Sequence, residues 1–175
     1  MKKLFDISAV IPVFNAGHFI RESIESLLTQ SEKVDEIIII DDGSEDDTWN
    51  IVERYAGENS NIRAYRNRGN RGVSFSRNRG ISLSRCSWIL FMDADDLGDE
   101  RLVSSSTSRI SALEKEYTTE DWILCYSAYK QIDEKGKEIA GVIRSRQWMP
   151  EETFGFEIVR NQIISTSGLL VRKDA

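Results

Sequence analysis

Four consecutive isoleucines run directly into two aspartates in the stretch Ile37-Ile38-Ile39-Ile40-Asp41-Asp42-Gly43-Ser44. The run is too short and too rich in β-branched side chains for a helix. A short run that is apolar at every position is typical of a strand buried on both faces, as in a parallel sheet. The aspartates and Gly43 end the strand abruptly, which places acidic side chains at its carboxyl end.

The same pattern recurs on both sides of this stretch. Residues 88–92 form a second apolar run that stops at Asp93-Ala94-Asp95-Asp96, while residues 7–11 and 62–65 predict a short strand and a weaker one. Between these strands, apolar residues recur at the spacing of helices, and residues 102–113 continue that spacing after the last of them. Strands that alternate with helices predict a three-layer α/β domain with a mostly parallel sheet.

The last third of the chain carries weaker signals. Residues 122–129 indicate a strand, and a turn at residues 135–137 is followed by a partner strand over 139–143. A surface helix is expected over residues 151–160 and a late strand over 168–172.

Composition and charge exclude several classes of protein. The chain has 175 residues, 40% of them hydrophobic and 30% charged, which fits one folded domain rather than a disordered chain. The net charge of −6 lacks the basic signature of a nucleic-acid binder. No apolar run approaches the roughly 18–20 residues of a membrane span, and no signal peptide is recognisable. Cys86 and Cys125 lack metal spacing, so we interpret them as reduced thiols of a cytoplasmic protein.

The acidic strand ends predict a cation site. Ligands of open α/β sheets bind beyond the carboxyl ends of the strands, where five carboxylates would repel one another without a counter-charge. Hard oxygen ligands suit magnesium or manganese, and Asp95 is the residue that we expect to bind the ion. We interpret Asp46, Asp47 and Asp99 as helix caps or solvated loop residues.

An arginine-rich segment separates the two acidic clusters. Seven arginines and no acid lie between Arg63 and Arg85, and the chain has neither of the common glycine-rich nucleotide loops. Binding of a phosphate would therefore depend on a metal ion and on arginine side chains. Arg77, among small and polar residues, is the candidate. The side chains that we interpret as a solvated basic face are Arg63, Arg66, Arg68 and Arg85.

Four motifs occur in order along the chain: Ile11-Pro-Val-Phe-Asn15, Ile40-Asp-Asp-Gly-Ser44, Asn70-Arg-Gly72 with Ser76-Arg-Asn-Arg-Gly80, and Ile89-Leu-Phe-Met-Asp-Ala-Asp-Asp96. Together they resemble the amino-terminal, donor-binding part of a family-two glycosyltransferase with the GT-A fold. The resemblance is strong over residues 5–100 and weaker over 101–175. It departs from the family pattern at Ser76, where alanine is usual.

The resemblance implies both an activity and a set of site residues. It implies transfer of a sugar, with inversion and with manganese or magnesium, from a nucleoside diphosphate sugar to a glycan, lipid or protein acceptor. Uridine is the base that it implies. Asp93 would contact the ribose side and Asp95 would bind the metal. The nucleotide-binding residues implied in this way are Pro12, Asn15, Asp41, Asp42, Arg77 and Asp93.

The base that deprotonates the acceptor is the missing part of this pattern. The family carries it in an acidic motif beyond the stretch that resembles residues 165–171, and we interpret Glu151, Glu152 and Glu157 as surface residues. We therefore expect residues 1–175 to form a single domain that is truncated on the acceptor side and prone to self-association. In the full-length protein, peripheral association with the cytoplasmic face of a membrane is compatible with this reading.

Two other functions remain open from the sequence. One is a non-catalytic nucleotide-sugar-binding module. The other is a phosphatase of the haloacid dehalogenase type, which also has Asp-x-Asp after a buried strand. Leu97 stands where such a phosphatase usually has threonine or valine.

Overall fold

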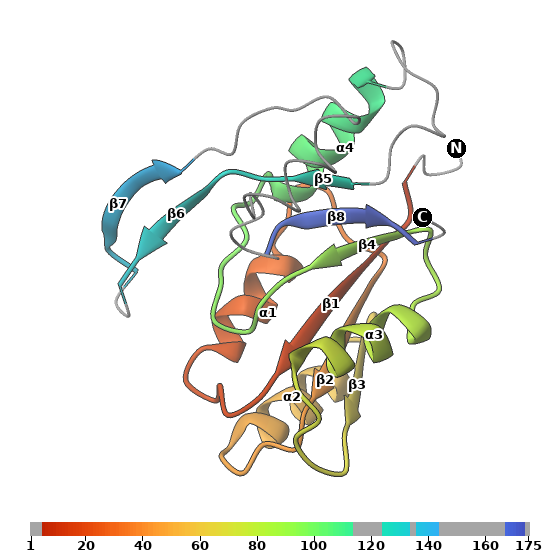
Figure 1. The fold of residues 1–175 in the computed structure, drawn as a ribbon, viewed down its shortest axis with the longest axis vertical. Coiled ribbons are helices and arrows are strands. Elements are labelled where there is room, and N and C mark those ends of the chain that lie inside the picture. The colour runs from red at the N-terminus through yellow and green to blue at the C-terminus, as the bar shows by residue number, and fades with distance from the viewer. Residues whose placement is uncertain (1–4, 114–123, 134–135, 144–166, 174–175) are drawn as a thin grey trace, which may run out of the picture.

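The computed structural model describes residues 5–113, 124–133, 136–143 and 167–173. Its centre is a six-stranded sheet with the order β3-β2-β1-β4-β8-β5 (Figure 1). The first four strands along the chain pair in parallel, and β8 runs antiparallel to both of its neighbours. The strands are β1 (Ile7–Val13), β2 (Glu36–Asp41), β3 (Ile62–Arg66), β4 (Trp88–Phe91), β5 (Leu124–Tyr126) and β8 (Leu169–Arg172). The prediction of a mostly parallel α/β sheet is therefore confirmed.

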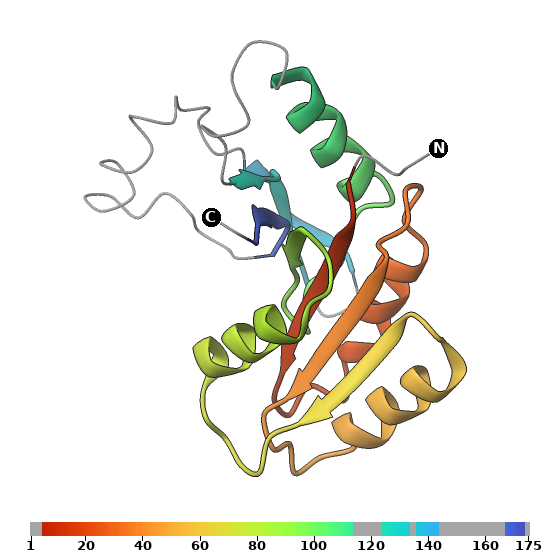
Figure 2. The same cartoon turned by 90° about the vertical axis from the view of Figure 1, so that its right-hand side faces the viewer.

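Helices cover both faces of this sheet. They are α1 (Ile20–Leu28), α2 (Thr48–Glu58), α3 (Val73–Leu83) and α4 (Leu102–Leu113). Figure 2 shows α3 on one face of β1–β3 and both α1 and α2 on the other. The isoleucine run packs against helices on both faces of the sheet, because successive side chains of a strand point to opposite sides. Ile37 and Ile39 pack in the larger core with α1 and α2, whereas Ile38 and Ile40 pack with residues of α3.

The strand order creates a switch point between β1 and β4. The chain moves outward from β1 to β3 and then returns to place β4 on the other side of β1. β1 pairs with β2 as far as Val13, but its pairing with β4 stops at Val10. Pro12 is buried at this divergence, where its missing N–H costs no ladder hydrogen bond. The carboxyl ends of β1 and β4 thus separate at the position where such sheets bind ligands.

The two remaining strands form a separate two-stranded hairpin. β6 (Tyr129–Ile132) and β7 (Glu138–Ile143) pair antiparallel through a turn at Gly136, which has a φ of 76°. The single strand expected over residues 122–129 is instead divided between β5 and β6, because the chain leaves the large sheet near Ser127. The helix expected over residues 151–160 lies outside the described residues. Within the described part, no helix is long and apolar enough to cross a membrane.

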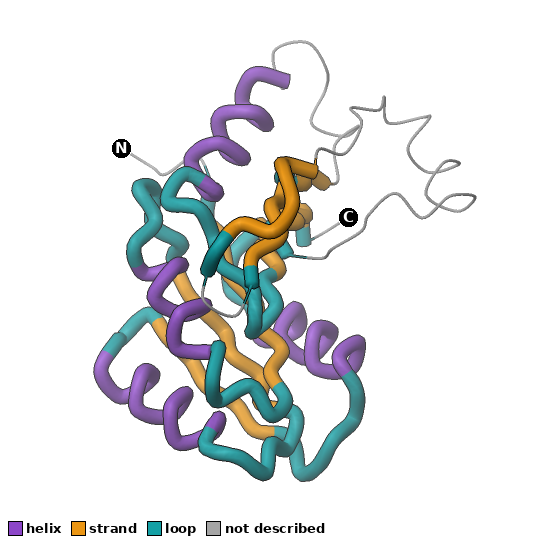
Figure 3. Tube along the Cα trace, turned by 90° about the vertical axis from the view of Figure 1, so that its left-hand side faces the viewer, coloured by secondary structure: helices purple, strands orange, loops and turns teal. Residues whose placement is uncertain are grey.

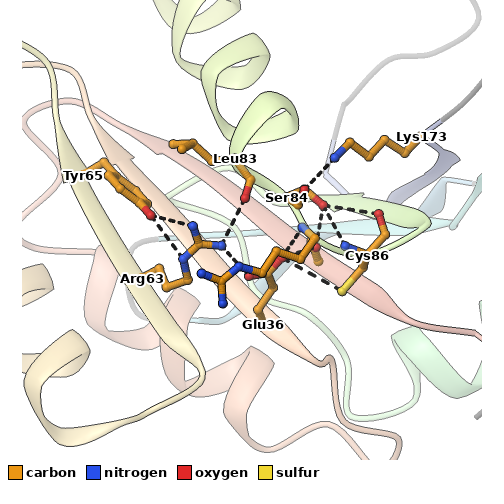
Figure 4. Close-up of polar contacts among 9 residues, drawn as sticks. Glu36, Arg63, Tyr65, Leu83, Ser84, Cys86 and Lys173 are labelled. Atoms are coloured by element: carbon orange, nitrogen blue, oxygen red, sulfur yellow. Dashed lines mark hydrogen bonds and ion pairs between the residues drawn. The ribbon is translucent and has the colours of Figure 1, made fainter.

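A buried polar network closes the amino-terminal edge of the sheet, opposite the acidic strand ends (Figure 4). Glu36 accepts hydrogen bonds from Ser8 Oγ and the Arg85 N–H, both at 2.7 Å, and forms an ion pair of 2.7 Å with Arg63. Arg63 also donates to the Tyr65 hydroxyl and to the Leu83 carbonyl. The interpretation of Arg63 as part of a solvated basic face is therefore wrong. The register of β2 with β3 brings a buried acid to it, and no neighbouring residue in the sequence could indicate that.

Candidate functional site

The loops that follow β1, β2 and β3 gather at one end of the sheet (Figure 3), and the first two interlock through Asn15. Its backbone adopts the left-handed conformation, with a φ of 49°, which asparagine tolerates better than most residues. The Asn15 N–H donates to Ser44 Oγ at 2.9 Å, and the Asn15 side-chain oxygen accepts the Glu45 N–H at 2.8 Å. Two of the motifs expected to bind a nucleotide are thus in direct contact.

Asp41 is fully buried at the end of β2, and Arg66 supplies its counter-charge. The Nε of Arg66 lies 2.9 Å from Asp41 Oδ2, and this contact is an ion pair without a hydrogen bond. The other oxygen accepts the Ser44 N–H at 3.2 Å, and Arg66 also donates to the Ser44 carbonyl. Arg66 is therefore part of the site's framework, although its side chain is 44% exposed, so its solvated position agrees with the prediction and only its ion pair was missed. It lies across from Asp41 in the parallel register of β2 and β3.

Asp42 anchors the loop that leads into α3. Its carboxylate accepts hydrogen bonds from the Asn67 side chain at 2.6 Å and from the backbone N–H groups of Arg71 and Gly72. Burial alone would raise the pKa of Asp42, but these hydrogen bonds and one from Ser76 outweigh it and lower the pKa. All of these donors belong to the protein, so the described role of Asp42 is to hold this loop. Contact between Asp42 and a nucleotide stays a prediction.

Gly43 explains why the loop after β2 and the loop after β3 can approach each other so closely. Its φ is +81°, and a Cβ at this position would lie 2.7 Å from the Cα of Gly69. Glycine avoids both the steric clash and the strain of the left-handed conformation.

Arg77 reaches from α3 to the segment after β4. Its Nη2 lies 2.6 Å from Asp93 Oδ1, and both side chains are partly buried. One turn later, Gly80 lets α3 pack directly on β1, because a Cβ there would lie 2.3 Å from Val10 Cγ1. The structure thus brings together two of the predicted site residues, Arg77 and Asp93, beside the switch point.

The acidic segment after β4 concentrates negative charge. Burial raises the pKa of Asp96, the nearby charges of Asp95 and Asp93 raise it further, and a hydrogen bond with Ser167 acts in the opposite direction. Asp95 itself is exposed. The predicted solvated or capping role of Asp99 agrees with its geometry, since its carboxylate accepts the Arg101 N–H just before α4. At α2 the capping acceptor is Asp46, which binds the Thr48 N–H, while Asp47 makes no capping hydrogen bond.

The donor set fits a hard cation that a ligand helps to coordinate. Among the described residues, no group of three or more His, Cys, Asp and Glu side chains could hold a metal ion. Magnesium and manganese are commonly bound by one or two carboxylates together with the phosphate oxygens of a substrate. An exposed Asp95 beside further carboxylates could supply the protein's share of such a site.

A groove of about 1230 Å³ begins beside this acidic segment. It runs between α4 and the hairpin of β6 and β7, and Asp95 and Asp96 lie at its wall. Three of its lining residues are large exposed apolar side chains, namely Leu97, Ile132 and Ile139. The groove therefore offers apolar surface next to the predicted metal ligand.

Sequence reasoning missed three residues, two on α1 and one just after it, that contact the acidic segment. Ser23 Oγ donates to the Asp93 carbonyl at 3.2 Å, Ser26 Oγ accepts the Gly98 N–H, and Gln30 binds the backbone on both sides of Glu100. One signal was present: Ser23 and Ser26 occur at helical spacing beside the apolar positions Ile20, Ile24 and Leu27.

Comparison with known proteins gives consistent similarities. Residues 8–115 match the sequence model of "Glycosyl transferase family 2". The uncharacterized glycosyltransferase EpsJ of Bacillus subtilis is 36% identical over 129 residues, which are 74% of this chain and 36% of EpsJ. The poly(ribitol-phosphate) β-N-acetylglucosaminyltransferase TarP of Staphylococcus aureus is 38% identical over 105 residues, which are 58% of this chain and 31% of TarP. The chain spans half or less of the length of these relatives.

Solved structures show the same fold. TarS 1–349 of S. aureus in complex with UDP-GlcNAc gives a TM-score of 0.69 at 22% identity, covering 96% of this chain and 45% of that one. The mannosyltransferase PcManGT of Pyrobaculum calidifontis in complex with GDP-Man and Mn²⁺ gives 0.63 at 17% identity, covering 74% of this chain and 37% of that one. At these identities the likeness supports the three-layer architecture alone.

Proposed function

Since the chain belongs to glycosyl transferase family 2, we propose that it binds the nucleoside diphosphate sugar of a sugar-transfer reaction. The observation that carries this proposal is the Arg77–Asp93 ion pair at the switch point, with exposed Asp95 two residues further on. Cationic and metal-binding groups lie together at the edge where α/β sheets take their ligands. Residues 1–175 would form one domain with this role.

The nucleotide lies, in this proposal, on the loops that follow β1 and β2. Asn15 is exposed there and is fixed in place by Ser44 and Glu45, so its position is set before a ligand binds. Asp41 and Pro12 form the buried floor, and Asp93 lies on the ribose side. Uridine is the base that we propose, and the complexes of TarS with UDP-GlcNAc and with UDP support this choice.

Asp95 is the proposed ligand of a manganese or magnesium ion. Such an ion, when bound, stabilises as a Lewis acid the negative charge that develops on the departing diphosphate. Arg77 adds a fixed positive charge near the same place, and its ion pair with Asp93 holds the guanidinium there. The presence of Mn²⁺ in the PcManGT structure supports a metal of this class.

The acceptor approaches, in this proposal, along the groove between α4 and the hairpin. An inverting transfer needs the acceptor hydroxyl on the face of the sugar opposite the diphosphate, with a base to take its proton. Asp95 lines this groove, so an acceptor in it would lie near the proposed metal and diphosphate. The family resemblance assigns the base to an acidic motif after residue 171. A glycan, a lipid-linked glycan or a protein could supply the hydroxyl.

The non-catalytic binding module is the second candidate, because the base has not been assigned to a described residue. The family match sets aside the phosphatase. Calorimetric titration with UDP, in manganese and in a chelator, tests donor binding for both remaining candidates. Turnover of a panel of nucleotide sugars, with and without acceptors, then separates them. UDP affinity that is equal with manganese and with chelator would contradict the metal-dependent site.

A further inference from the structure

Three polar side chains hold the acidic segment, two on helix α1 and one, Gln30, just after the helix ends. Ser23 Oγ donates to the Asp93 carbonyl at 3.2 Å, and Ser26 Oγ accepts the Gly98 N–H at 3.0 Å. The side chain of Gln30 donates to the Asp99 carbonyl at 2.7 Å and accepts the Val103 N–H at 3.1 Å. The backbone from β4 to the start of α4 is therefore held at several points by α1 and the residues that follow it.

The spacing and burial of these side chains show that the contact is part of the fold's interior. Ser23 and Ser26 are three positions apart and lie on one face of α1, and Gln30 follows two residues after the helix ends. Ser23 is fully buried and Gln30 is 1% exposed. A buried amide is costly unless its groups are paired, and Gln30 uses both its donor and its acceptor on the facing segment or on Ser26.

Asp95 lies between these attachment points. The segment is held at Asp93 before it and at Gly98 after it, which leaves the Asp95 side chain exposed between them. Asp93, Asp95 and Asp96 carry like charges within four residues, and their repulsion favours a more open segment. The hydrogen bonds from α1 oppose that opening.

From this geometry we propose that Ser26 and Gln30 are positioning residues, which hold Asp95 where a divalent cation and a diphosphate can share it. This inference rests on the proposed function and adds a role for α1 to it. A carboxylate that is held in place binds a cation without first being ordered, so the attachment should increase the metal-dependent part of nucleotide affinity. The metal-independent part depends on other loops and should not change.

The test compares Ser26→Ala and Gln30→Met with Thr29→Ala. Thr29 is exposed, and its hydroxyl bonds only to carbonyls of α1 itself among the hydrogen bonds described here. UDP affinity is measured by calorimetry in Mn²⁺ and in a chelator. We expect the enhancement by Mn²⁺ to fall by about five- to tenfold in Ser26→Ala and Gln30→Met. Affinity in chelator should stay within about twofold of wild type, and Thr29→Ala should behave as wild type.

A second readout reports on the segment directly. Backbone amide exchange should speed up at Gly98 in Ser26→Ala and at Val103 in Gln30→Met, since each amide loses its acceptor. If Gln30→Met does not fold, Ser26→Ala still decides the question, because Ser26 is only partly buried and loses, besides the hydrogen bond from Gly98, only one to the Ser23 carbonyl within α1 among those described.

Two results would overturn the inference in different ways. A lowered melting temperature with an unchanged Mn²⁺ enhancement would show that these side chains only stabilise the fold. A wild-type protein with no Mn²⁺ enhancement would remove the proposed metal site itself, and the positioning role with it.

Discussion

Arg77 Nη2 and Asp93 Oδ1 lie 2.6 Å apart, and this ion pair joins α3 to the segment that follows β4. The two residues come from opposite sides of the switch point, since α3 packs on β1 and β2 while β4 lies beyond β1. The contact ties an arginine to the acidic segment that carries Asp95. The effect of this ion pair on nucleotide binding can be measured separately from its effect on folding.

Arg77→Ala should weaken UDP binding by roughly ten- to a hundredfold, because hydrogen bonds that involve charged groups are each worth about 1.5–3 kcal/mol. Asp93 would also lose its counter-charge beside Asp95 and Asp96. Calorimetry in Mn²⁺ measures the effect. Arg54→Ala is the control, since it removes the same charge from an exposed position on α2, where the guanidinium stacks over Tyr55. Equal affinity of the two variants for UDP would rule out contact between Arg77 and the nucleotide.

Asp95→Asn should abolish most of the increase in UDP affinity that Mn²⁺ produces, whereas Asp99→Asn should preserve it. Both variants remove one negative charge from the same segment. Asparagine accepts a capping hydrogen bond as well as aspartate does, so Asp99→Asn should keep the contact with the Arg101 N–H and the start of α4. Titration with Mn²⁺ at fixed UDP distinguishes the two. An equal loss in both variants would show that overall charge, rather than coordination by Asp95, attracts the ion.

Gly80→Ala should be clearly less stable than Gly57→Ala. Alanine favours a helix over glycine by up to about 1 kcal/mol. A Cβ at Gly57 meets nothing within 4 Å, so this variant should be neutral or slightly more stable. At Gly80 the Cβ would lie 2.3 Å from Val10 Cγ1, and overpacking of this kind costs about 1–3 kcal/mol. Urea unfolding gives both values. If Gly80→Ala is as stable as Gly57→Ala, α3 does not pack on β1 as described.

Much of the fold could be predicted because its signals are local. The isoleucines of β2 and the apolar run of β4 are strands by their own composition, and each ends in acids that the parallel topology brings to one edge. The break between β5 and β6 was not predictable from residues 122–129. It depends on the two strands joining different sheets, which local sequence does not encode.

The contacts that sequence reasoning missed have one physical cause, which is pairing between residues far apart in the sequence. Arg63 and Arg66 lie in a stretch without acids, so they resemble a solvated basic face. Their partners are Glu36 and Asp41, on the neighbouring strand. Gln30 was missed for the same reason, because its partners lie about 70 residues further along the chain.

Glu36→Gln should destabilise the protein at neutral pH and much less in acid. Burial would raise the pKa of Glu36, but hydrogen bonds from the Arg85 N–H, Ser8 and Arg63, together with the charge of Arg63, lower it below 4.5. A carboxyl whose pKa is lower in the folded state contributes stability above its unfolded pKa, and this contribution is lost as pH falls through the folded pKa. The difference between wild type and Glu36→Gln should therefore be largest near pH 7 and shrink below about pH 4.5.

The expected size of this effect follows from the burial of the pair. Removing one partner of a buried ion pair costs about 3–5 kcal/mol, and the Glu36 side chain is 9% exposed. Glu138→Gln is the matched control, because its ion pair with Lys130 is exposed on the hairpin and should contribute at most about 1 kcal/mol. Urea unfolding of the three proteins at pH 7 and at pH 3.5 makes the comparison. If Glu36→Gln lowers the unfolding free energy by the same amount at both pH values, the charge of Glu36 does not stabilise the amino-terminal edge of the sheet.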